Sequence, residues 1–169
     1  TAYGGFRFFS FGMEGISNQK LNINRLFDHL LLFYTGISRS SEDILTVQEK
    51  NTQSNMESLR KIKSLAIQAL SEIREGTFEG IGSLLNDGWR FKKSLAPKIS
   101  NPIIDKWYER ALDAGAIGGK ILGAGGGGYL LLFCPLAIKN RIRQSLSDMI
   151  ELPIAPEPDG AKVILNYRT

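Results

Sequence analysis

The sequence has very little cysteine and histidine, and this excludes several classes of protein. It contains one of each, Cys134 and His29. A single cysteine cannot form a disulfide within the chain, and the two residues together cannot supply the ligands of a structural zinc site. Cys134 lies within an apolar run, so we expect a buried, unreactive thiol. We expect His29 to be a structural residue at the start of a strand, and we predict no metal ligands in this chain.

Long hydrophobic runs are also missing. The longest apolar run extends from Tyr129 to Ile138 and is interrupted by Pro135, so it is too short for a membrane-spanning helix. No signal peptide is recognisable at the start of the chain. We therefore expect a cytoplasmic protein of bacterial type that has no membrane partner.

Charge of one sign is not concentrated anywhere in the chain. The net charge is +4, but the basic residues form short, separate groups at 60–63, 90–93 and 139–143. A nucleic-acid-binding face would need a continuous basic surface with interleaved aromatic residues. We therefore expect no nucleic-acid partner, and a phosphorylated small molecule suits this modest positive charge better.

Glycine, in contrast, is abundant, and eight of the 18 glycines cluster between Gly115 and Gly128. Four of them are consecutive, and the apolar segments 117–122 and 129–134 flank them, which predicts two strands joined by a glycine loop. Without Cβ atoms, this loop can adopt positive φ and approach a phosphate or a neighbouring loop closely. The alternative is a flexible hairpin turn.

The segment Lys120–Gly128 resembles the third conserved motif of the GHMP kinases, small-molecule kinases named for galactose, homoserine, mevalonate and phosphomevalonate. Its lysine, two aliphatic residues and Gly-Ala-Gly-Gly-Gly-Gly fit that motif without a gap. The preceding segment 114–119 and the apolar strand that follows resemble the branch that phosphorylates heptose sugars. The resemblance extends over nearly the whole chain.

The first residues, Thr1–Phe6, resemble the stretch that directly follows the catalytic aspartate of heptose kinases. This resemblance implies the C-terminal part of a longer kinase, with the catalytic residue upstream of Thr1 and the nucleotide loop in a missing N-terminal kinase domain. We expect this part to be inactive alone. Residues 1–25 would be the hairpin that ends the N-terminal domain, and residues 26–169 would be the C-terminal domain.

The hydrophobic pattern predicts an α+β fold. The resemblance implies a ferredoxin-like, or split βαβ, domain with helices inserted after its first strand, preceded by the hairpin from the N-terminal domain. Strands are expected at 6–11 and 21–23, which form the hairpin, and at 29–34, 117–122, 129–134 and 161–167, with helices at 41–75, 77–95, 103–114 and 136–150.

The segment between Tyr34 and Ser41 is the second candidate for chemistry, after the glycine loop. Hydroxyl groups, the Arg39 guanidinium and the N–H groups of a helix start occur together there, which suits a phosphate or sugar hydroxyls. Ser40 and Ser41 have an alternative role as helix caps. Capping does not explain Arg39.

The third candidate is the pair Lys92 and Lys93. Neighbouring residues on one helix cannot face the same way, so at most one lysine points into a cleft. A solvated helical face is the alternative, but the resemblance favours one of them as a ligand of the sugar's phosphate. The predicted site comprises the glycine motif near the phosphate or substrate (Gly123, Ala124, Gly125, Gly126, Gly127 and Gly128) and the substrate-binding residues Thr35, Gly36, Ser38, Arg39, Ser40, Lys92 and Lys93.

The resemblance implies a kinase that uses ATP and Mg²⁺ to phosphorylate the anomeric hydroxyl of a heptose 7-phosphate. Two alternatives remain: a fucokinase-like or galactokinase-like enzyme for an unphosphorylated sugar, and a non-catalytic binding module. The expected partners are the sugar phosphate, ATP and the missing N-terminal domain. Exposed strand edges and an aromatic cluster in the hairpin also predict self-association, through Phe6, Phe8, Phe9 and Phe11.

Overall fold

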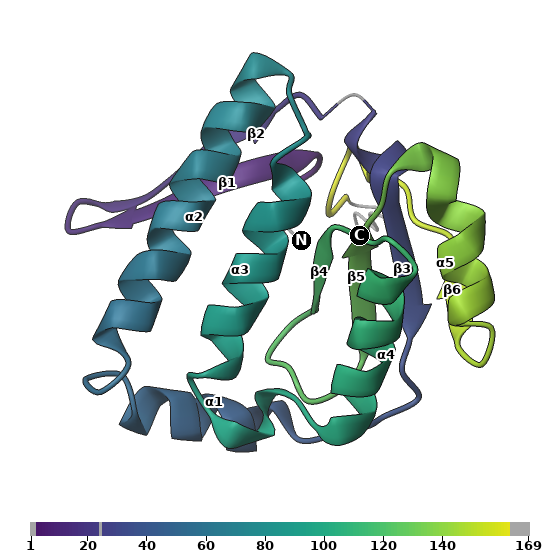
Figure 1. Cartoon of the computed structure of the whole chain (residues 1–169). Coiled ribbons are helices and arrows are strands. Elements are labelled where there is room, and N and C mark those ends of the chain that lie inside the picture. Colours follow the sequence, from purple (N-terminus) through teal and green to yellow (C-terminus); the bar gives the residue numbers. More distant parts are fainter. Residues whose placement is uncertain (1–2, 24, 163–169) are drawn as a thin grey trace, which may run out of the picture.

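The computed structural model describes residues 3–23 and 25–162 and shows an α+β fold with one four-stranded sheet and a separate hairpin (Figure 1). The order in the sheet is β4-β5-β3-β6, and all neighbouring strands are antiparallel. Because β5 lies between β3 and β4, the sheet has the predicted split βαβ arrangement. Its strands are β3 (Leu30–Tyr34), β4 (Gly118–Ile121), β5 (Tyr129–Phe133) and β6 (Ile150–Leu152).

Four α-helices are inserted between β3 and β4, where the sequence predicted three. Their ends follow local capping chemistry: Gly76 closes α2 in the left-handed region, and the Asn101 side chain accepts hydrogen bonds from the first amides of α4. One more helix precedes β6. The helices are α1 (Ser41–Lys50), α2 (Met56–Glu75), α3 (Ile81–Lys93), α4 (Pro102–Asp113) and α5 (Lys139–Ser145).

The prediction of one long helix over 41–75 was wrong, because the chain turns between α1 and α2 at residues 51–55. The residues there are polar and short, and they bond to nearby backbone instead of continuing the helix. The hydroxyls of Thr52 and Ser54 donate to the carbonyls of Gln48 and Asn51. The Asn55 amide donates to the Leu95 carbonyl, which ties this turn to the end of α3.

The predicted helix over 136–150 is also shorter than expected. A 3-10 turn precedes α5, and residues Ile150–Leu152 form β6 beside β3. The strand was not predicted because the helical spacing of Ile142 and Leu146 suggested that the helix continues. Pairing of β6 with β3 satisfies the backbone N–H and C=O groups on the free edge of β3. The strand predicted at 161–167 falls largely outside the described residues.

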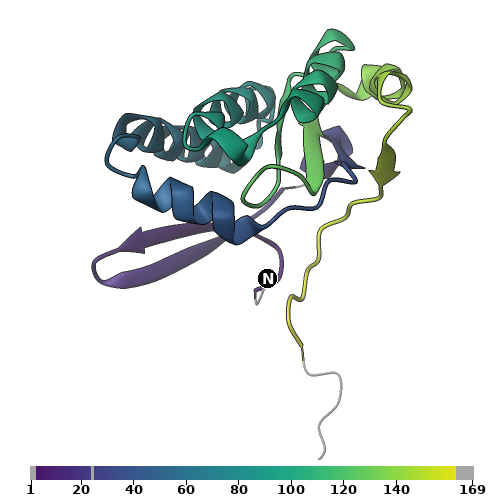
Figure 2. The same ribbon diagram turned by 90° about the horizontal axis from the view of Figure 1, so that it is seen from below.

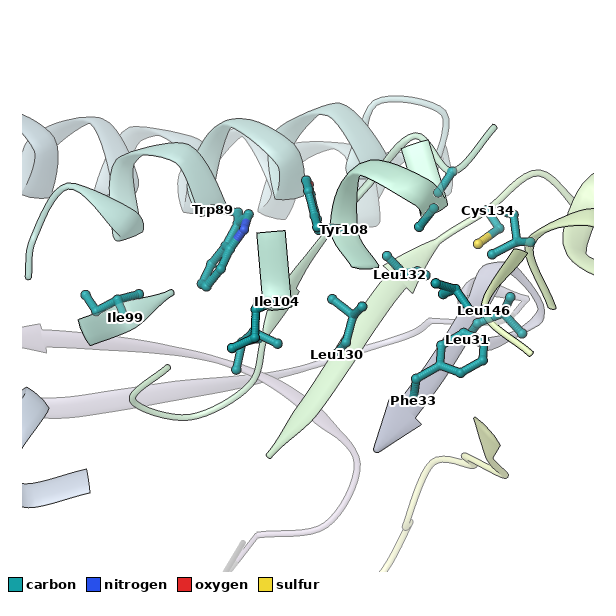
Figure 3. Packing of buried hydrophobic residues seen from close by; sticks show 14 of the residues in the cluster. Leu31, Phe33, Trp89, Ile99, Ile104, Tyr108, Leu130, Leu132, Cys134 and Leu146 are labelled. Atoms are coloured by element: carbon teal, nitrogen blue, oxygen red, sulfur yellow. The ribbon is translucent and has the colours of Figure 1, made fainter. Parts of the chain in front are cut away.

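A hydrophobic core fills the space between the sheet and helices α3, α4 and α5 (Figure 3). Trp89 from α3 and Ile104 from α4 are 1% and 0% exposed, and they face Leu130 on β5. Cys134 is fully buried as predicted, and burial raises the pKa of its thiol to about 12. His29 stacks on Phe133 with 5.2 Å between ring centroids, which agrees with a structural role.

Strand β4 is fixed tightly against the helices. The Tyr108 hydroxyl on α4 accepts a hydrogen bond from the Gly119 amide (3.1 Å) and donates to Asn86 on α3 (2.9 Å). A Cβ at Gly118 would lie 2.0 Å from the Gly82 carbonyl oxygen, so only glycine allows α3 to approach β4 this closely. The strand that leads into the glycine loop is therefore firmly anchored.

The predicted hairpin is present, but its second strand lies at 15–21 and not at 21–23: β1 (Phe6–Gly12) pairs with β2 (Gly15–Leu21). It lies beneath α1 and α2 in Figure 2, and Leu21 and the half-buried Phe8 contribute to a second, smaller apolar cluster. Towards its tip, Phe11 and Ile16 are 76% and 67% exposed.

Candidate anion-binding site at the glycine loop

The glycine loop, residues 122–128, joins β4 to β5 and has a backbone conformation that residues with a Cβ rarely adopt. Gly123, Gly125, Gly126 and Gly128 all have φ between +71° and +108°. A Cβ at Gly125 would lie 2.8 Å from the Ile99 carbonyl oxygen, and one at Gly127 would lie 2.4 Å from that of Ile37. The glycines are thus required both by conformation and by close packing.

Hydrogen bonds from two other segments hold the loop in place. The Gly126 amide donates to the Ile99 carbonyl (2.7 Å), and the Gly128 amide donates to the Ile37 carbonyl (3.2 Å). The amide and the hydroxyl of buried Thr35 both donate to the Gly128 carbonyl at 2.9 Å. The glycine loop is therefore a packed element of the fold between the segments 35–40 and 96–101.

The segment after β3 gives its residues different positions. Thr35 supports the glycine loop, and Gly36 has φ +67° with open space around it. Ser38 is exposed and makes no hydrogen bond within the described residues. The Ser40 hydroxyl caps α1 by accepting from the Asp43 amide at 3.4 Å, so the alternative role of this serine is the one seen.

Two cations bind carbonyl groups of the glycine loop. Arg39 Nε donates to the Gly125 carbonyl, and Arg39 Nη1 donates to the Ser41 hydroxyl. Lys92 Nζ donates to the Gly123 carbonyl from the end of α3. Side chains from β3–α1 and from α3 thus meet at the loop.

Lys93 has a different surrounding from its neighbour. It forms an ion pair with Asp105 at 3.0 Å, and the Ser100 hydroxyl donates to the same carboxylate. The structure therefore brings Arg39 and Lys92 to the glycine loop but pairs Lys93 with the start of α4.

Lys120 is a further cation in this region, and the sequence analysis did not name it as a binding residue. It is half-buried on β4, and burial lowers its pKa. Burial also lowers the pKa of Lys92 from 10.5 to about 8, with further contributions from the nearby charges of Lys120 and Arg39. The sequence did contain a signal for this role, because Lys120 is the first residue of the glycine motif. Its neighbours Gly119 and Ile121 share the core face of the strand, so the Lys120 side chain points to the opposite face.

Two hollows lie near the side chains that bind the glycine loop, and their chemistry differs. One of about 320 Å³ borders Gly126 and has polar side chains in its lining, among them Arg39, Ser40, Asp43 and Asn101. The other, of about 490 Å³, lies between α2, α3 and the sheet and is almost wholly apolar, apart from Lys92 and Lys120. Arg39 therefore offers positive charge to the first hollow, and Lys92 and Lys120 offer it to the second.

The described part of the chain offers little to a metal ion. Among residues 3–23 and 25–162, no group of three or more His, Cys, Asp or Glu side chains could hold one. Mg²⁺, which the family resemblance implied, is thus not matched by ligands here. In the same residues, no helix has the length and apolar character needed to cross a membrane.

Comparison with known proteins identifies the family. The family model for the C-terminal region of GHMP kinases matches residues 66–151. The chain therefore belongs to the GHMP kinase family and contains the C-terminal domain of that family.

Two curated relatives are sugar kinases. The chain is 29% identical over 145 residues to the D-glycero-alpha-D-manno-heptose 7-phosphate kinase of Campylobacter jejuni, covering 79% of this chain and 42% of the relative. It is 31% identical over 131 residues to the L-fucokinase/L-fucose-1-P guanylyltransferase of Bacteroides fragilis, covering 74% and 14%. The chain thus spans less than half the length of these relatives.

Solved structures share the fold. Mevalonate kinase from L. major, in complex with R-mevalonate, superimposes with a TM-score of 0.74 at 17% identity, over 94% of this chain and 51% of that one. Phosphomevalonate kinase from Streptococcus pneumoniae, in complex with phosphomevalonate and AMPPNP, gives a TM-score of 0.68 at 18% identity, over 85% and 43%. At these identities, the likeness concerns the fold alone.

Proposed function

We propose that the intact protein is a GHMP-type sugar kinase that transfers a phosphoryl group from ATP to the anomeric hydroxyl of a heptose 7-phosphate. The observation that carries this proposal is the convergence of Arg39, Lys92 and Lys120 on a glycine loop with no carboxylate paired to any of them in the described residues. Phosphoryl transfer depends on positioning and on neutralising phosphate charge, which such a cluster supplies. The similarity to a heptose 7-phosphate kinase supports the choice of sugar.

Each residue would have a distinct task in this proposal. The Arg39 guanidinium and the exposed Ser38 hydroxyl would bind the sugar phosphate on the polar side of the loop, while Lys92 would add positive charge from α3. Lys93, already paired with Asp105, would contribute to the fold of the site. The glycine loop would bring its backbone close to the substrate without side chains in the way.

The catalytic residue and the nucleotide-phosphate loop would belong to an N-terminal domain outside this chain, and so would any Mg²⁺ ligands. In this proposal, residues 1–25 end that domain and residues 26–169 form the C-terminal domain. The chain's coverage of 42% of the heptose kinase supports this division, as does the match to a C-terminal family model. ATP as the donor is supported by the AMPPNP in a structural neighbour, and a cytoplasmic location is part of this proposal. The chain alone would lack kinase activity.

A fucokinase-like activity on an unphosphorylated sugar is the second candidate, and the similarity to the Bacteroides fragilis enzyme favours it. A coupled assay of ADP release on the intact protein separates the two. We expect the highest kcat/KM for heptose 7-phosphate, because free heptose and L-fucose cannot engage Arg39 as a phosphate does. Equal or better turnover of a free sugar would contradict the heptose phosphate assignment.

The same assay on the present chain tests whether it forms only part of the site. We expect no ADP release above background. Turnover in the usual kinase range of about 1–100 s⁻¹ would show that the catalytic groups lie within this chain. If neither the chain nor the intact protein turned over any sugar, although the intact protein bound the phosphosugar, a non-catalytic binding module would replace the kinase.

A further inference from the structure

Lys92 and Lys120 carry charges that the fold does not neutralise. The Lys120 ammonium group has no hydrogen-bond or ion-pair partner in the described residues, and the Lys92 ammonium group binds the Gly123 carbonyl and no carboxylate. Other half-buried cations have more partners: Lys93 and Arg110 each pair with a carboxylate, and Lys139 binds two carbonyls. A half-buried ammonium without a counter-charge costs free energy that a bound anion would offset.

The two ammonium groups are also held in position by rigid elements. Lys120 sits on β4, which Tyr108 fixes through the neighbouring Gly119 amide. Lys92 lies near the end of α3, which packs on β4 through the contact of Gly82 with Gly118. An anion that binds between them would not need to order either element. The site is thus preorganised, and little binding free energy would be lost to ordering it.

The surroundings of the pair select the type of ligand group. Both lysines line the apolar cavity of about 490 Å³, and the rest of its lining offers no carboxylate, hydroxyl or amide side chain. A sugar ring in that cavity would leave its hydroxyls unpaired, whereas an oxyanion needs only the two cations. Lysine binds phosphate as a point charge and needs no planar, bidentate geometry.

We propose that Lys92 and Lys120 form an oxyanion site for a phosphate monoester in the apolar cavity between α2, α3 and the sheet, next to the Gly123 carbonyl of the glycine loop. The inference deepens the proposed function, on which it rests for the role of the phosphate in catalysis. It adds a phosphate ligand, Lys120, to the cluster that Lys92 forms with the nearby charge of Arg39. A sugar phosphate and the terminal phosphate of a nucleotide share the recognised chemistry.

Binding to the present chain tests the site without any need for catalysis. The Lys92 and Lys120 side-chain signals are followed by NMR while inorganic phosphate, glucose 6-phosphate, ATP or, as an uncharged control, glucose is added. We expect phosphate-bearing probes to shift both signals and glucose to shift neither. The larger shift with glucose 6-phosphate would assign the site to a sugar phosphate, and the larger shift with ATP would overturn that assignment. No shift with any probe would overturn the site.

A pair of matched variants tests the assignment to Lys120. We expect K120M to weaken phosphate binding by about tenfold or more, the usual effect of losing a charge-assisted hydrogen bond, and K120R to retain most of it. K63M removes one exposed lysine from α2, outside the predicted site, and should change the affinity less than about twofold. Equal losses in K120M and K63M would reduce the effect to general charge and overturn the site.

Two further measurements distinguish loss of phosphate binding from loss of folding and from loss of catalysis. Circular dichroism checks that K120M keeps the helical content of the chain, and K120R keeps the proposal testable if K120M fails to fold. A kinase assay on the intact protein addresses the proposed function separately. Phosphate binding that depends on Lys120 in an inactive intact protein would overturn the kinase proposal and leave the oxyanion site standing.

Discussion

The glycine loop and the β1–β2 hairpin both join antiparallel strands, but they are stabilised in different ways. The loop is bonded to the carbonyls of Ile37 and Ile99 and held by Arg39 and Lys92, so segments distant in sequence determine its shape. The hairpin depends on its own strand pairing and leaves Phe11 and similar side chains exposed. The glycine loop is thus fully packed within this chain, whereas the hairpin presents an apolar surface that a partner would cover.

The largest expected effect comes from breaking the loop at Gly126. In G126V a Cβ would meet the Lys98 carbonyl oxygen at 2.8 Å, and valine disfavours the φ of +75° found there. We expect kcat/KM of the intact enzyme to fall by at least about 100-fold, because a small displacement of a positioned group costs that much. Steady-state kinetics with circular dichroism as a folding control measures this.

G76A is the matched control, because Gly76 at the end of α2 also has positive φ (+74°) but has open space around it and lies outside the predicted site. It should retain most of the activity, since it adds local strain without a collision. Near-normal kcat/KM in a folded G126V enzyme would make residues 123–128 an ordinary turn.

A smaller effect is expected from R39A, which removes the hydrogen bond to the Gly125 carbonyl and a positive charge beside the loop. We expect KM for the phosphosugar to rise by about tenfold with a modest change in kcat, as for a contact made equally in the ground state and the transition state. R90A removes an exposed arginine of the same helix as Lys92 and serves as the control. A large fall in kcat at unchanged KM would contradict a binding role.

The hairpin should promote self-association of this chain, since Phe11 and Ile16 form an exposed cross-strand pair. F11S/I16S should weaken association by about tenfold in sedimentation equilibrium, from the apolar area no longer buried. L45S alters a residue of similar exposure on α1 and should leave association unchanged. A wild-type chain that stays monomeric at high concentration, with hairpin amides protected from exchange, would contradict this prediction.

The smallest effect concerns pH and Lys92. The pKa of Lys92 is lowered from 10.5 to about 8 by burial, Lys120 and Arg39, so its charge opposes folding at neutral pH. Between pH 8 and 10.5 the unfolded chain binds more protons at this residue, and this contribution to stability rises with pH. Urea unfolding at pH 7.5 and 9.5 should therefore show a larger gain, or a smaller loss, for wild type than for K92M. Equal changes in the two proteins would place the Lys92 pKa near its ordinary value.

Much of the fold could be predicted from the sequence because its signals are local. The apolar segments around four consecutive glycines gave β4 and β5, and the aromatic alternation near Phe8 gave the hairpin. Strand β6 was missed because Leu146 and Ile150 continue a helical spacing, and only the free edge of β3 explains why the chain is extended there. The turn at 51–55 was missed because hydroxyl and amide competition for backbone groups leaves no mark on apolar periodicity.

The candidate site was less accessible to prediction, because residue type indicates chemistry but not partners. Arg39 and Lys92 were named for their charge, and the fold places both on carbonyls of the loop. The sequence could not show that Lys93 pairs with Asp105, twelve residues away. Lys120 was not predicted as a binding residue, because the motif that it begins was interpreted through its glycines alone. Strand alternation could have indicated it, since its side chain points away from the core face.

Hydrogen exchange of the loop amides tests most directly whether the glycine loop is a fixed part of the fold. The amides of Gly126 and Gly128 donate to Ile99 and Ile37, so we predict exchange as slow as in the β4–β5 ladder. Amides near the hairpin tip should exchange much faster in the same sample. Gly126 and Gly128 amides that exchange as fast as those near Gly12 would contradict the account, because a mobile loop could not present Arg39, Lys92 and Lys120 as one site.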